Sequence, residues 1–177
     1  MACILSLNID KGCLDSIGGV KKFWIVKHSD IDPTSTVLTS GVITTLAAVA
    51  APSSATPIFS YEVQSESGLC EATSETNKQN GSTFWNHTAT FPLTKMQINT
   101  RNEIKVLAVM NTIVIALDNN GTYWVYGYDN GLINAGTKSS TGTAMGDQNG
   151  YTVSLQSAEP ADAIEIDLAA FSALINP

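Results

Sequence analysis

Apolar and polar residues alternate with a period of two through most of this chain, and that pattern predicts β-strands. The first run, 22–27, is rich in aromatic and β-branched residues, and the polar, Pro-containing stretch 30–33 ends it. Further strands are predicted at 41–46, 58–64, 151–155 and 163–168. The pattern therefore indicates a mainly β, antiparallel fold, either a β-sandwich or a split barrel.

A long hairpin is predicted between 69–76 and 83–91, with a turn at 78–81 that contains Asn80 and Gly81. Asn-Gly favours tight turns because both residues tolerate positive φ. In the return strand, one face carries Trp85, His87, Ala89 and Phe91. In the first strand, Glu71 and Glu75 share a face with Leu69 and Thr73.

A second hairpin joins 112–117 to 122–128 through an Asp-Asn-Asn-Gly turn. Its first arm is apolar at consecutive positions, which is typical of a central strand covered on both faces.

One helix is predicted between the two hairpins. Thr100 and Glu103 have the spacing of a capping box, although an earlier start at 94–97 also fits. Ile104, Leu107 and Ala108 would share one face. The opposite side is apolar as well, so we expect a mostly buried helix that flanks the sheets; the residues on that side are Val106, Val109 and Met110.

The 177 residues suit a single domain, 1–177, with two unusual stretches. Residues 47–57 are small and include Pro, which predicts a loop or exposed arm. Residues 129–149 are rich in Gly, Ser, Thr and Asn and predict a long loop, a feature that is often functional or docked on a partner. The apolar tail 169–177 is expected to pack against a neighbouring molecule.

The composition narrows the classes of function. Only 14% of the residues are charged, and neutral hydroxyl and amide side chains take their place. Such a surface suits a protein largely covered by other subunits. The net charge of -7 and the nine Lys and Arg residues argue against tight binding of nucleic acid, because phosphate binding needs clustered cations.

No targeting or membrane signal is evident. The start lacks a basic region, and the apolar stretch 41–51 contains two threonines and is too short to span a membrane. We expect a protein made and folded in a cytoplasm, without a membrane partner. Cys3, Cys13 and Cys70 show no spacing typical of disulfides or zinc sites.

Candidate chemical groups are few, and each has a plainer structural interpretation. His28 with Asp30 and Asp32 has metal-binding residue types, but a polar strand end before a turn is the favoured interpretation. Cys70 could pair with His87 across the first hairpin. A reactive thiol needs an electropositive setting, which this acidic hairpin lacks.

Glu71 and Glu75 could pass for a carboxylate pair, but a solvated acidic face is favoured. Trp24, Trp85 and Trp124 could form a sugar-binding platform, although strand tryptophans more often pack sheets. No catalytic residue, metal site or cofactor is expected.

Three segments stand out beside the order of the predicted elements: TRNEI at 100–104, DNNGTYW at 118–124 and GTAMGDQNGY at 142–151. Over about residues 60–160, this order and these segments resemble the tail-tube proteins of tailed bacteriophages. The last segment and the MACI start are similar to small virion proteins of phages and prophages of gut bacteria, including the crAss-like group.

This resemblance implies a structural virion protein of the phage tail, with a β-sandwich or split barrel flanked by a helix. It would form rings, commonly hexameric, that stack around a channel through which double-stranded DNA passes without tight binding. The two long hairpins would pair with neighbouring subunits to form the inner barrel. Glu71 and Glu75 are then candidate channel-facing residues, and Leu132, Ile133 and Met145 are candidate subunit-interface residues.

Two other classes remain open. A neck or tail-terminator protein would form a single ring of the same fold, with other phage tail or neck proteins as partners. A carbohydrate-binding or decoration module would use exposed tryptophans. An enzyme is the class that the sequence supports least.

Overall fold

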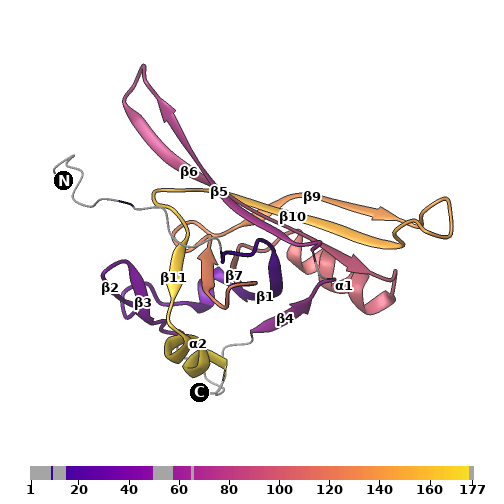
Figure 1. Cartoon of the computed structure of the whole chain (residues 1–177), viewed down its shortest axis with the longest axis horizontal. Helices are drawn as coiled ribbons and strands as arrows, with labels where there is room; N and C mark the ends of the chain where they lie inside the picture. The colour runs from indigo at the N-terminus through magenta and orange to yellow at the C-terminus, as the bar shows by residue number, and fades with distance from the viewer. Residues whose placement is uncertain (1–8, 10–14, 50–57, 65, 176–177) are drawn as a thin grey trace.

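The computed structural model describes residues 9, 15–49, 58–64 and 66–175, and Figure 1 shows the two β-sheets and two helices that they form. The mainly β prediction is confirmed. One sheet has seven strands in the order β2-β3-β11-β8-β7-β1-β4. Its members are β1 (Val20–Lys27), β2 (Val37–Thr39), β3 (Val42–Thr45), β4 (Phe59–Glu62), β7 (Thr112–Asp118), β8 (Tyr123–Tyr126) and β11 (Ile164–Ile166).

The second sheet has four strands in the order β5-β6-β10-β9. They are β5 (Leu69–Asn77), β6 (Ser82–Thr94), β9 (Ile133–Ser140) and β10 (Gly150–Glu159). All neighbours in this sheet are antiparallel. The tips of the β5–β6 and β9–β10 hairpins project beyond the body of the molecule in different directions (Figure 1).

The main core fills the space between the sheets. Phe23 of β1 meets Phe91 of β6, with ring centroids 5.1 Å apart, and Val153 and Leu155 of β10 pack beside them. Strand β7 is buried on both faces, as its continuous apolar character predicts. Val114 belongs to this core, whereas Ile113 and Ile115 face the other side of the sheet.

Helix α2 (Leu168–Ile175) covers that other side of the seven-stranded sheet. Phe171 packs on Trp24 and Tyr123, with ring centroids 4.8 and 4.5 Å apart. The expectation that this apolar tail packs against a neighbouring molecule is therefore wrong for the described part of the tail, because its apolar side chains are needed to cover the chain's own sheet.

Helix α1 (Ile98–Leu107) confirms the predicted helix but begins after Gln97, so the capping box at Thr100 is wrong. Glu103 instead accepts a hydrogen bond from the Tyr61 hydroxyl at 3.0 Å. Within this helix only Ile104 and Leu107 are buried. Val109, two residues beyond the end of the helix, is 86% exposed. The helix is therefore buried on one face, because no element covers its outer side in the described structure.

The long loop predicted at 129–149 is also corrected, since β9 occupies its centre and pairs with β10. The sequence pattern did not predict this strand, which is rich in Gly, Ser and Thr, because an edge strand exposed to water needs few apolar side chains.

Of the predicted arm, residues 50–57 lie outside the described part, and Ala48 forms a bridge with Ile31. Neither described helix is long and apolar enough to cross a membrane.

Candidate functional site

A broad polar surface covers the side of the four-stranded sheet that faces away from the core, which we call the outer face. Cys70 and Ala72 contact the core, and Ala89 and Phe91 are part of it, so the alternate residues of β5 and β6 point outward. The pairing extends this face across β10 and β9. Its residues include Leu69, Glu71, Thr73, Glu75, Phe84, Asn86, Thr88, Thr90, Pro92, Thr94, Gly150, Thr152, Ser154, Gln156, Ala158, Ile133, Gly136, Lys138 and Ser140.

Hydroxyl and amide groups dominate the outer face, and several of them satisfy one another. Thr90 donates from Oγ1 to Ser154 Oγ at 3.2 Å, and the Asn86 side-chain amide donates to the Glu75 carboxylate. The charged residues of this face are Glu71, Glu75 and Lys138. Such a surface is hydrated and offers no cluster of cations to a phosphate backbone.

Glu71 and Glu75 lie on the outer face with Leu69 and Thr73, as the alternation predicts, and both are exposed. They stand four positions apart along one strand, a distance of about 13 Å. That distance exceeds the separation at which two carboxylates act on one glycosidic bond. Their position facing a channel stays a prediction.

Both edges of the four-stranded sheet are free within the described part of the chain. β5 pairs with β6 alone and β9 pairs with β10 alone, over nine and eight residues respectively. Long edge strands present unpaired backbone donors and acceptors to another chain. The outer face and its two edges are therefore the candidate assembly site.

The three candidate interface residues occupy different environments. Leu132 is fully buried, with 0% exposure, so its assignment to a subunit interface is wrong. Its backbone exchanges hydrogen bonds of 2.7 and 2.9 Å with Thr112 at the start of β7, and this bridge draws the side chain into the core. Ile133 on the β9 edge and Met145 near the β9–β10 tip are exposed.

A buried polar cluster that the sequence pattern did not reveal anchors the turn between β8 and β9. Glu159, at the end of β10, is only 2% exposed. It accepts hydrogen bonds from the backbone amides of Asp129 and Asn130 at 3.0 and 3.1 Å, and from the Ser157 hydroxyl at 2.7 Å. These donors satisfy the carboxylate and fix the chain that leads into β9.

His87 holds the other side of the same turn. Its Nδ1 accepts a hydrogen bond from the Gly127 amide at 3.2 Å, so the proton is on Nε2, which donates to the Ala161 carbonyl at 3.0 Å. Burial lowers the pKa of His87, and this effect outweighs the nearby Glu159 carboxylate, which acts to raise it. A neutral imidazole with both nitrogens engaged acts as a structural clamp.

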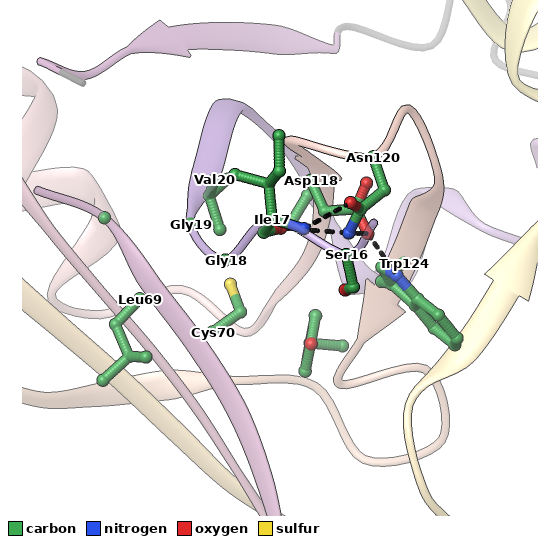
Figure 2. A pocket seen from close by; sticks show the side chains of 13 residues that line it. Ser16, Ile17, Gly18, Gly19, Val20, Leu69, Cys70, Asp118, Asn120 and Trp124 are labelled. Atoms are coloured by element: carbon green, nitrogen blue, oxygen red, sulfur yellow. Dashed lines mark hydrogen bonds between the residues drawn. The ribbon is translucent and has the colours of Figure 1, made fainter. Parts of the chain in front are cut away.

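A hollow of about 290 Å³ is lined by Leu69 and Cys70 and by Ile17–Val20. Figure 2 shows these residues around it. The Asn120 side chain holds the Ile17 backbone in place by two hydrogen bonds. Its Oδ1 accepts from the Ile17 amide at 2.8 Å, and its Nδ2 donates to the Ile17 carbonyl at 3.0 Å. Burial raises the pKa of the Cys70 thiol above its usual range, so the thiol stays protonated.

Cys70 and His87 do not form a nucleophile–base pair in this arrangement. Ala89 stands opposite Cys70, and Ala72 stands opposite His87. Both nitrogens of His87 are already engaged by the backbone.

The His28 region also forms turns. His28 donates from Nε2 towards the carbonyls of Tyr128 and Asp129, at 3.2 and 3.1 Å. The Asp32 carboxylate accepts from the side chains of Ser35 and Thr34, which lower its pKa. Among the residues that the structure describes, no group of three or more His, Cys, Asp or Glu side chains is arranged to hold a metal.

The three tryptophans do not share a platform. Trp24 and Trp124 pack against opposite faces of the seven-stranded sheet, and Trp85 lies on β6 of the other sheet. All three are half-buried, and Trp24 and Trp124 pack against the two cores.

Comparison of the chain with family models, curated proteins and solved structures finds no match. The features of this chain that bear on its function are therefore the sequence resemblance and the geometry of the outer face.

Proposed function

We propose that this protein is a structural virion protein of a tailed bacteriophage. Its copies form hexameric rings that stack into a tail tube, or that line the channel at the neck, and double-stranded DNA passes through the centre. The observation that carries the proposal is the four-stranded sheet, which combines a polar outer face with two long edges that no described residue pairs with.

The free edges suit assembly by extension of the sheet. β5 runs antiparallel to β6, β6 to β10 and β10 to β9, so β5 and β9 run in opposite directions. When copies are related by rotation about one axis, β9 of one copy meets β5 of the next as an antiparallel neighbour. Closure of the ring removes every free edge of this sheet.

Six copies would contribute 24 strands to a closed barrel. With strands about 4.7 Å apart and tilted by about 36°, the barrel measures about 44 Å between opposite backbones. Even after side chains fill part of this space, the bore is wider than a DNA double helix.

The outer face has the chemistry that such a channel requires. It presents hydroxyl and amide groups, with two carboxylates against one ammonium group in each copy. A DNA duplex carries one negative charge for about every 1.7 Å of its axis, so a lining with few cations lets it slide without binding tightly. Glu71 and Glu75 then project into the channel.

The test is electron microscopy of the purified protein at increasing concentration. We expect regular rings with an open centre. Stacked tubes would select the tail tube, and single rings would select the neck or terminator position.

Two variants that place new charges on exposed apolar residues test the role of the strand edges, one at the edges and one, as the control, away from them. Leu69→Lys combined with Ile133→Lys should abolish rings, because lysines on an edge strand oppose edge-to-edge pairing. Leu168→Lys, on the exposed side of α2, should leave them intact. A protein that stays monomeric at every concentration and is absent from purified virions would overturn the proposal.

A further inference from the structure

We infer that adjacent copies pair β9 with β5 in a single register, with Ser140 opposite Leu69, and that an ion pair between Lys138 of one copy and Glu71 of the next selects it. This inference rests on the proposed ring and adds the residues that determine how copies recognise one another.

The staggered ends of the strands set the first constraint. Leu69, Thr90, Ser154 and Gly136 form one row across the sheet, and Glu71 lies in the row that ends at Ile133. If the next copy joined with its rows in line with those of the first, Gly136 would stand opposite Leu69, and only the first residues of β5 would meet β9. We count the shift along the strand from this alignment. A shift of four positions places Ser140 opposite Leu69 and Ile133 opposite Glu75, so that β9 is paired along its whole length.

The same shift satisfies the geometry of a closed barrel. Four positions along a strand are about 13.5 Å, and four strand spacings are about 19 Å. Their ratio corresponds to a strand tilt of about 36°, within the 35–45° that barrel closure requires.

Charge distinguishes this register from its neighbours. Four positions of shift put Lys138 directly opposite Glu71, on the same side of the joined sheet. Shifts of two or six positions place Lys138 opposite Leu69 or Thr73. A shift of eight positions places Lys138 opposite Glu75, but it moves Ile133 past the end of β5.

Both charges are available for this contact. The ion pair found within the described part of the chain joins Lys22 to Glu62, so among the described residues neither Lys138 nor Glu71 has a charged partner. Glu75 differs, because its carboxylate already accepts a hydrogen bond from Asn86. Opposite charges that face each other across paired strands are favourable, and like charges are unfavourable.

The experiment is a charge exchange, read as the protein concentration at which rings appear by sedimentation and electron microscopy. Lys138→Glu alone and Glu71→Lys alone should each raise that concentration about tenfold or more, because each places like charges in contact at every junction. The double variant Lys138→Glu with Glu71→Lys should return it to within about threefold of the unmodified protein.

The matched control is Lys138→Glu with Glu75→Lys, which has the same composition and the same net charge as the rescuing pair. It should not restore assembly. Thermal unfolding of every variant checks the fold, which we expect to be unchanged because all three side chains are exposed.

The outcomes separate this inference from the function on which it rests. Rings of the unmodified protein without rescue by Glu71→Lys, or with equal rescue by Glu75→Lys, would overturn the register and leave the proposed function standing. Absence of rings in the unmodified protein would count against both.

Discussion

His87 and Glu159 show how single buried polar side chains can stabilise an exposed structural feature. They hold the turn between β8 and β9 from opposite sides, through the Gly127 amide on one side and the Asp129 and Asn130 amides on the other. Gly127 adopts a φ of 73°, which glycine accepts without strain. The edge strand β9 therefore starts from a fixed position.

The neutral state of His87 makes folding sensitive to mild acid. Its pKa is lowered in the folded protein, so the unfolded chain binds more protons as the pH falls. Stability from this group is complete above the ordinary histidine pKa of about 6.5 and is lost as the pH falls from there towards the folded value. We expect the free energy of unfolding, measured with urea, to decrease between pH 7 and 5.5.

A His87→Gln variant is the control, because glutamine does not titrate. We expect lower stability at pH 7 and a nearly flat profile over the same interval. The lowered pKa values of Asp118 and Asp147 act only below about pH 4, outside this interval. An unchanged slope in the variant would show that another group is responsible.

At the scale of elements, each sheet of the sandwich has a different arrangement. The seven-stranded sheet is covered on both faces, by the other sheet and by α2, whereas the four-stranded sheet is covered on one face only (Figure 1). The first sheet therefore supports the fold, and the second is left free to contact other molecules.

The packing of α2 gives a prediction at this scale. Phe171→Ala should lower the free energy of unfolding by about 3–5 kcal/mol, because it leaves a cavity against Trp24 and Tyr123. Leu168→Ala, on the exposed side of the same helix, should change it by less than about 0.5 kcal/mol. Chemical denaturation followed by tryptophan fluorescence measures both, and equal effects would contradict the docked position of α2.

For the whole molecule, the residues that stabilise the fold are separate from those available for assembly. The large buried side chains lie in the two cores, while the outer face and the free edges carry polar or isolated apolar residues. If the proposed assembly site is correct, changes there should alter association without unfolding the protein.

Two adjacent residues test this separation. Leu132→Ala should lower the free energy of unfolding by about 2–5 kcal/mol, because Leu132 is fully buried. Ile133→Ala should change it by less than about 0.5 kcal/mol but weaken ring formation, since Ile133 is exposed on the β9 edge. Denaturation of dilute protein, compared with sedimentation at high concentration, separates the two effects; a loss of stability in both variants would contradict the separation.

The amino-acid sequence by itself determined the strands other than β2 and β9, both Asn-Gly hairpins and the faces of β5 and β6. Glu71 is exposed, and His87 shares the inward face of β6 with Ala89 and Phe91, as the alternation predicts. These features follow from local causes, because the strand period of two and the conformational preferences of turn residues act over a few neighbouring positions.

Tertiary structure alone decided the features that depend on distant partners. Leu132 is buried because it bridges to Thr112, and Glu159 is buried because the amides of Asp129 and Asn130 solvate its charge. β9 is a strand because β10 pairs with it, and α2 covers the sheet of its own chain. In each case the stabilising free energy comes from a contact between segments well separated in sequence. The local pattern of either segment therefore does not predict that contact.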